Sequence, residues 1–342
     1  MPRKKPSKGL NHRQKERIDL IRQRRSDRVI SRQRAEWDLL ADTTLEGPEE
    51  GLVIAHFGLN VEVEDLKGGR CRCAVRETAG IEPVCGDRVI WQRANADQGV
   101  VTAVKDRHTI LQRPGAYRRL KTIAANIDQI FITTTSQHPN TGLLDRYLVA
   151  AEAANIAATI LINKMDLAED PEALMAQMAP YRAMDYPVLP LSATTGEGIA
   201  ELEEKLAGRV SIFVGQSGVG KSSLVRRWVP EESAPAIAPV KASNGKGRHT
   251  TTVARLYHLP AGGSLIDSPG IREFGLHGIS REQVGGYFRD ISPFLQGCRF
   301  SNCSHSHEPG CMVLSAIDNG KIDSVRLQSL RRIQSSLPAS SH

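Results

Sequence analysis

Residues 215–223 of this sequence, "GQSGVGKSS", have the spacing of a loop that binds nucleotide phosphates. An apolar strand is predicted directly before the loop and a helix directly after it. Glycines let backbone amides turn toward the phosphates, and the start of the helix adds a partial positive charge. We expect Lys221 to contact the β- and γ-phosphates and to assist catalysis, and Ser222 to bind Mg²⁺. The predicted phosphate-binding residues are Gly215, Gln216, Ser217, Gly218, Val219, Gly220, Lys221, Ser222 and Ser223.

A second motif, Asn163-Lys164-Met165-Asp166, stands at the end of a predicted apolar strand. Its position matters, because ligands bind at the carboxyl ends of parallel strands. The Asp166 carboxylate can accept hydrogen bonds from N1–H and the 2-amino group of guanine, a donor pair that adenine lacks. We expect Lys164 to lie along the base and Asn163 to brace the loops. The motif therefore predicts binding of GTP and GDP rather than adenine nucleotides.

Two shorter matches follow other predicted strands. Ser192-Ala193 comes after "PVLPL" and could offer a backbone N–H to guanine O6. The motif "DSPG" at 267–270 comes after "SLI", so that Asp267 can hold the Mg²⁺ shell through water and the Gly270 N–H can sense the γ-phosphate. Each match is short and is informative only because it lies at the end of a predicted strand.

The segment 241–256, "KASNGKGRHTTTVARL", is polar and rich in glycine, which is typical of a mobile switch. We expect one of its three threonines, Thr251, to close over Mg²⁺ when GTP is bound. Position 271 holds Ile where many GTPases place a Gln that orients the attacking water. Intrinsic hydrolysis should therefore be slow, and His249 or a partner must position the water. The alternative for His249 is an ordinary exposed loop residue.

Cysteine and histidine gather near the C-terminus in the pattern Cys298-x4-Cys303-x-His305-x5-Cys311. Three thiolates and one imidazole suit a closed tetrahedral Zn²⁺ site, whose role is structural because no open coordination position is implied. His307 lies nearby and is the alternative to His305 as the fourth ligand. Disulfides are the competing interpretation, and a cytoplasmic chain is not expected to form them.

The order of these motifs along the chain is unusual. In an ordinary GTPase the phosphate loop comes first, whereas here the base-reading motif precedes it. Five matches that each follow a predicted strand are not explained by chance. Cutting a GTPase domain after its second switch and joining its old termini produces this order, and folds tolerate such permutation because termini often lie close together. We therefore predict a circularly permuted domain, in which the second switch leads directly into the Cys/His module and could move it.

The elements that must position these residues fall into three groups. Residues 45–115 show about five short, β-branched strands, which predicts a small closed barrel of the oligonucleotide/oligosaccharide-binding (OB) type with an RNA-binding role. Residues 116–280 alternate apolar strands with helices, which predicts a parallel α/β P-loop domain. Residues 281–342 combine the Cys/His cluster with a basic helix and predict an α-helical zinc-binding domain. Residues 1–44 form a basic tail and linker.

The distribution of charge points to a polyanionic partner. The 342 residues carry a net charge of +7, yet residues 1–35 alone hold thirteen Lys and Arg against three acidic residues. We expect this tail to be disordered and to bind RNA, with a plain solubility tail as the alternative. We find no apolar run of membrane-spanning length and no signal peptide, so a cytoplasmic protein without membrane association is expected. A monomer is expected as well.

Six stretches together resemble the ribosome small subunit-dependent GTPase A family (RsgA, also called YjeQ). They are "LLDRYLVAAEAA", "INKMDL", "GQSGVGKSSL", "GRHTTT", "DSPGIREFGL" and "CRFSNCSHSHEPGC". The resemblance covers roughly residues 45–330 and implies an OB domain, a permuted GTPase domain and a zinc domain. It also implies that His249 stands where the family is proposed to carry a catalytic histidine, and it supports His305 as the zinc ligand.

The resemblance further implies an activity and partners. It implies hydrolysis of GTP to GDP and phosphate, in late maturation of the small ribosomal subunit, with stimulation by that subunit. It also implies contact with ribosomal RNA near the decoding region. The alternative from another class is an RNA-binding chaperone in which GTP is a structural ligand, and the missing Gln at position 271 favours it.

Overall fold

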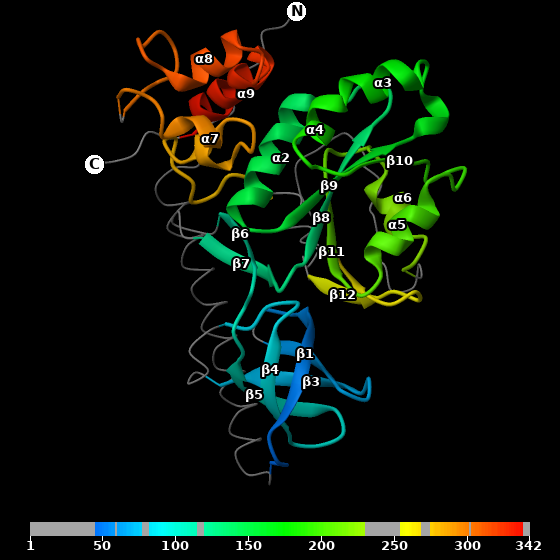
Figure 1. The fold of residues 1–342 in the computed structure, drawn as a ribbon. Coiled ribbons are helices and arrows are strands. Elements are labelled where there is room, and N and C mark those ends of the chain that lie inside the picture. Colours follow the sequence, from blue (N-terminus) through cyan, green and yellow to red (C-terminus); the bar gives the residue numbers. More distant parts are fainter. Residues whose placement is uncertain are drawn as a thin grey trace, which may run out of the picture.

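The structure is a computed structural model that describes residues 45–58, 60–76, 82–114, 120–229, 254–267, 274–300 and 302–337. Figure 1 shows a β-barrel at one end, a larger α/β body in the middle and a small helical module packed against one side of that body. Among the described residues, the helices are all too short or too polar to cross a membrane.

The N-terminal body is a closed five-stranded barrel. Its strands are β1 (Glu49–His56), β2 (Asn60–Asp65), β3 (Arg70–Val75), β4 (Arg88–Arg93) and β5 (Gln98–Val104). They pair in the order β1-β2-β3-β5-β4, and β4 pairs back with β1, which closes the barrel and leaves no free edge. Alternate side chains fill the interior around Trp91, and Cys71 and Cys73 lie among them. These two cysteines are therefore ordinary core residues, and both point to the same face of β3 because they are two positions apart.

The central body is a mainly parallel sheet with helices on both faces. Its strands are β8 (Gln129–Thr135), β9 (Ala157–Asn163), β10 (Val188–Pro190), β11 (Val210–Val214), β12 (Arg255–His258) and β13 (Ser264–Asp267). The helical segments between them are α2 (Thr141–Ala153), η3 (Met165–Leu167), α3 (Pro171–Gln177), α4 (Ala179–Ala183), α5 (Ile199–Leu206) and α6 (Lys221–Val225). Ile130 and Ile132 of β8 pack on the face that α2 covers, and Phe131 faces the opposite core, with Leu202 and Leu224 of α5 and α6.

The strand order shows the permutation directly. The strands lie in the order β10-β9-β8-β11-β13-β12, and only β12 runs antiparallel to its neighbour. The chain enters at β8, moves outward to β10 and then returns to β11 on the other side of β8. The strand that carries the phosphate loop thus sits at the centre of the sheet, although three strands of the domain precede it. Such a reversal between β8 and β11 is the point at which ligands bind in open α/β sheets.

Paired strands connect the barrel to the central body. The hairpin of β6 (Ile110–Pro114) and β7 (Leu120–Ala125) leads from one to the other, and it lies across the domain boundary predicted after residue 115, which remains a prediction. Strand β12 also pairs with β1 at its edge, between Arg255 and Ala55. Polar contacts reinforce this seam: Arg255 forms an ion pair with Glu62 at 3.2 Å, and His258 Nε2 is hydrogen-bonded to Glu64 at 2.5 Å.

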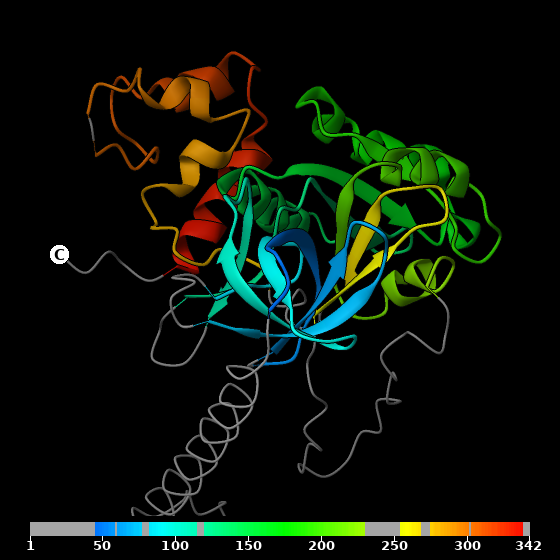
Figure 2. The same ribbon diagram turned by 90° about the horizontal axis from the view of Figure 1, so that it is seen from below.

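The C-terminal module consists of short helical segments and the loop that holds the cysteines. The segments are η5 (Val284–Tyr287), α7 (Ser292–Leu295), α8 (Met312–Asp318) and α9 (Ser324–Ser335). Asp323 caps α9 by accepting a hydrogen bond from the Val325 amide at 2.9 Å. The module packs against α2, and Figures 1 and 2 both place α9 beside that helix.

Candidate nucleotide site and metal centre

The phosphate loop begins where β11 ends and requires glycine there. Gly215 has φ +140°, and a Cβ on it would lie 2.2 Å from the Thr133 carbonyl oxygen of the neighbouring strand. The loop therefore passes closer to β8 than any other residue would allow. Residues 216–218 are exposed at the carboxyl edge of the sheet, and α6 starts at Lys221. Lys221 Nζ donates to the carbonyl oxygens of Gly215 and Gln216 at 2.7 and 2.5 Å, which holds the ammonium group on the loop.

One buried side chain joins the three loops that sequence analysis assigned to the nucleotide. Asn163, 1% exposed, donates from Nδ2 to the Val219 carbonyl at 2.8 Å. Its Oδ1 accepts from the amides of Lys164 at 2.8 Å and Ala193 at 3.0 Å. The phosphate loop, the base-reading motif and the Ser192-Ala193 loop are therefore held in one arrangement by a single amide group.

We predict that Gly220→Ala disrupts this arrangement. Gly220 has φ +97°, and an added Cβ would lie 2.1 Å from Asn163 Nδ2, so Asn163 would have to give up its bond to Val219. Gly218→Ala is the matched control, because Gly218 also has a positive φ, +86°, but its Cβ would meet nothing within 4 Å. Titration with a fluorescent guanine nucleotide should show affinity at least about tenfold weaker for Gly220→Ala than for Gly218→Ala. Equal affinities would contradict the bracing role of Asn163.

The base-reading motif is held by hydroxyl groups. Lys164 has a left-handed backbone, φ +65°, and its carbonyl accepts from Ser136 Oγ at 2.6 Å. Ser136 was not predicted from the sequence. It directly follows β8, and this position at the carboxyl end of a parallel strand could have indicated that it belongs to the site. Asp166 accepts at Oδ1 from Ser192 Oγ at 2.5 Å, which orients the exposed carboxylate. Ser192 therefore helps to position the Asp166 carboxylate through its side-chain hydroxyl.

The Ala193 amide already has a partner within the protein. It donates to Asn163 Oδ1, and the Ser192 amide donates to the Glu197 carbonyl at 3.0 Å. The bond to guanine O6 remains a prediction. A bond from Ala193 to the base would have to share or replace the bond to Asn163.

The remaining predicted residues divide into those that are described and those that are not. Asp267 is the last residue of β13, which pairs with β11, so it lies beside the strand that carries the phosphate loop. His249, Thr251 and Gly270 lie outside the described residues, as do the tail and Ile271. Their predicted roles at Mg²⁺ and in catalysis remain predictions.

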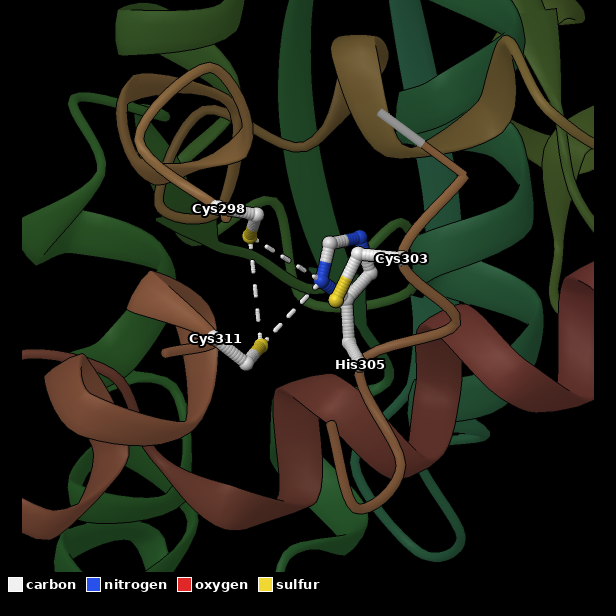
Figure 3. A group of neighbouring side chains, drawn as sticks. All are labelled: Cys298, Cys303, His305 and Cys311. Atoms are coloured by element: carbon white, nitrogen blue, oxygen red, sulfur yellow. Dashed lines mark hydrogen bonds between the residues drawn. The ribbon is translucent and has the colours of Figure 1, made fainter. Parts of the chain in front are cut away.

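The four predicted metal ligands lie together in the C-terminal module (Figure 3). Cys298, Cys303, His305 and Cys311 point their ligand atoms toward one another, all within 4.8 Å. Cys298 Sγ is 3.9 Å from Cys311 Sγ, and His305 Nδ1 is 3.6 Å and 3.4 Å from these two sulfurs. A tetrahedral Zn²⁺ ion places its sulfur ligands about 3.8 Å apart and sulfur about 3.5 Å from nitrogen. The donor set and its spacing therefore fit zinc, and His307 is not part of the cluster.

The loop around the cluster is shaped to hold these ligands. Burial lowers the pKa of His305, which favours the neutral imidazole that binds metal. Arg331 of α9 donates to the His305 carbonyl oxygen. Glu308 accepts hydrogen bonds from the Ser304 hydroxyl and the Ser304 and Ser306 amides, and these bonds hold the pKa of its carboxyl well below its usual range. The ligand loop is thus organised by contacts beyond the four ligands.

A parallel sheet with a phosphate loop and guanine-reading motif in permuted order, flanked by a barrel and a Cys3His module, defines a circularly permuted GTPase. The chain belongs to the RsgA GTPase family, whose model matches residues 104–277. It is 46% identical to the small ribosomal subunit biogenesis GTPase RsgA of Pseudomonas fluorescens strain SBW25, over 97% of this chain and 98% of that protein. The counterpart in Azotobacter vinelandii is 45% identical over 96% of this chain and 97% of that protein.

Solved structures agree with this membership. The crystal structure of YjeQ from Thermotoga maritima matches with a TM-score of 0.68 and 32% identity, covering 85% of this chain and 99% of that one. YloQ, described as a circularly permuted GTPase, matches with a TM-score of 0.67 and 28% identity, covering 86% of this chain and 98% of that one. The predicted fold class is therefore confirmed, and the chain is a GTP-hydrolysing enzyme.

Proposed function

We propose that this GTPase acts in the maturation of the small ribosomal subunit and is stimulated by it. The observation that carries the proposal is the match over nearly the whole chain to proteins named small ribosomal subunit biogenesis GTPase. The modules on either side of the GTPase domain support it. An OB-type barrel offers a surface for nucleic acid, and the basic tail would attract an RNA backbone. Contact with ribosomal RNA near the decoding region belongs to the same proposal.

The chemistry proposed for the site uses residues from all three motifs. Asp166 reads guanine, Lys221 binds the β- and γ-phosphates, and Ser222 with Thr251 binds Mg²⁺. His249 or a group of the subunit positions the attacking water. Mg²⁺ would stabilise the charge that develops on the transferred phosphoryl group. Zn²⁺ in the Cys3His cluster would have a structural role. A cytoplasmic monomer without membrane association completes the proposal.

The proposed cycle makes docking depend on the nucleotide. GTP with Mg²⁺ would order the switch segments and favour binding to the subunit, and hydrolysis would weaken it and release the protein. In the alternative, the protein is an RNA-binding chaperone with GTP as a structural ligand. Its binding to the subunit would then not depend on the γ-phosphate. The missing Gln at position 271 favours that alternative only if turnover stays slow on the subunit.

Sedimentation with purified small subunits tests the cycle. We expect at least about tenfold tighter binding with a non-hydrolysable GTP analogue than with GDP, and no specific binding to large subunits. Gly220→Ala is the control for nucleotide dependence. At a nucleotide concentration that saturates only the unaltered protein, the variant should bind the subunit equally with the analogue and with GDP. Equal docking of the unaltered protein with the analogue, with GDP and without nucleotide would overturn the cycle.

A further inference from the structure

Helix α2 contacts the phosphate loop on one side. Tyr147, 6% exposed, lines a small cavity together with Gln216 and Val219 of that loop. Its ring stacks on Phe274, with the ring centroids 6.1 Å apart and the planes 3° from parallel. Burial raises the pKa of Tyr147, and the Gly215 backbone that faces its hydroxyl opposes this rise. Tyr147 therefore contacts both the phosphate loop and Phe274, which follows the "DSPG" motif of residues 267–270 in the chain.

The same helix contacts the C-terminal module on its other side. Asp145, 4% exposed, accepts hydrogen bonds from the Tyr181 hydroxyl at 3.0 Å and from Ser329 and Arg326 of α9. Arg326 also pairs with Asp290 of the module at 2.8 Å. Residues two apart on a helix point about 200° from each other, so Asp145 and Tyr147 face nearly opposite directions.

The contact between α2 and α9 is buried and charged. Arg326 is 7% exposed and its guanidinium lies 4.9 Å from the centre of the Phe288 ring. Breaking a buried pair by removing one partner leaves an uncompensated charge, which is strongly destabilising. The module is consequently seated on α2 in one defined position, and a shift of α2 cannot leave α9 in place without breaking these bonds.

We propose that α2 couples the phosphate loop to the C-terminal module, with Tyr147 sensing the loop and Asp145 carrying the displacement to α9 through Arg326 and Ser329. The module would then respond to the nucleotide through buried contacts in addition to the chain connection after the second switch. Coupling is reciprocal, so a change in how the module sits must alter the relative affinities for GTP and GDP. The inference goes beyond the proposed function, because it requires nucleotide binding but no ribosomal partner.

Hydrogen exchange of α9 provides the test, in the absence of ribosomal subunits. The full chain is compared with saturating GDP and with a saturating non-hydrolysable GTP analogue. We expect exchange over residues 324–335 to differ by at least about threefold between the two nucleotides. Tyr147→Phe, which keeps the ring stack and loses the hydroxyl facing Gly215, should reduce the difference, and only the part carried by the chain connection after the second switch should remain. Tyr186→Phe is the matched control, because it removes a 3.0 Å bond to Glu152 of the same helix, keeps the ring on which Arg289 of the module lies, and leaves the bonds of Asp145 in place.

A second variant approaches the coupling from the module. Ser329→Ala removes one bond to Asp145 and leaves the ion pairs intact. It should change the ratio of the GTP-analogue and GDP dissociation constants by at least about threefold, and Tyr186→Phe should leave that ratio unchanged. The proposal is overturned if α9 exchanges alike in both nucleotides, if Tyr147→Phe keeps the full difference, or if Ser329→Ala leaves the ratio unaltered.

Discussion

Replacing Asp166 by Asn should weaken GTP binding by roughly a hundredfold or more and should strengthen binding of xanthosine triphosphate. The Asp166 carboxylate is the exposed side-chain acceptor of the motif, because Asn163 is buried and its Oδ1 already accepts from Lys164 and Ala193. An amide presents one donor and one acceptor, which suits xanthine, where an oxygen replaces the 2-amino group. Competition binding with the two triphosphates measures the change as a ratio of dissociation constants.

Ser192→Ala is the matched control for this specificity change. It removes the hydroxyl that donates to Asp166 Oδ1 at 2.5 Å and leaves the carboxylate in place. We expect a loss of GTP affinity of only a few-fold, corresponding to about 1 kcal/mol, and no gain for xanthosine triphosphate. If Asp166→Asn leaves the preference between the two triphosphates unchanged, the motif does not read guanine.

Replacing His305 by Ala should remove zinc from the protein and unfold the loop of residues 298–311. Structural zinc contributes about 10–16 kcal/mol of apparent binding free energy in small zinc domains, and the loss of one of four ligands removes much of it. Zinc content by atomic emission and protease sensitivity of the loop measure the result. His307→Ala is the control, because His307 lies in the same loop outside the cluster.

The two histidine variants also test the choice that the sequence left open. With one zinc ion per chain expected in the unaltered protein, His307→Ala should retain it and His305→Ala should lose it. The reverse outcome would assign the fourth ligand to His307. Retention by both variants would show that neither imidazole is required by itself.

Much of the site followed from the sequence because its parts are local. The phosphate loop, the base-reading motif and the Asp267 motif each follow an apolar strand, and parallel strands bring their carboxyl ends to one edge. The motif order alone therefore indicated the permuted sheet. The cluster of Cys298, Cys303, His305 and Cys311 was predictable for the same reason, because its ligands span only fourteen positions.

The contacts that join these parts could not be predicted. Asn163 bonds to Val219 and Ala193, and Asp145 meets Arg326, which is 181 positions away in the chain. Such pairs leave no periodicity or spacing in one sequence, because only tertiary packing brings them together. The barrel closure between β1 and β4 and the pairing of β1 with β12 are non-local in the same way. The bond from the Ala193 amide to Asn163 is likewise visible only in the folded chain.

The most direct test of the proposed GTPase cycle is GTP turnover with and without purified small ribosomal subunits, for the unaltered protein and for Ser222→Ala. We predict slow turnover of the protein alone and at least about tenfold stimulation by small but not large subunits. This stimulation should be lost when the Mg²⁺-binding hydroxyl of Ser222 is removed. Absence of stimulation, or equal stimulation by large subunits, would contradict a GTPase cycle driven by the small subunit.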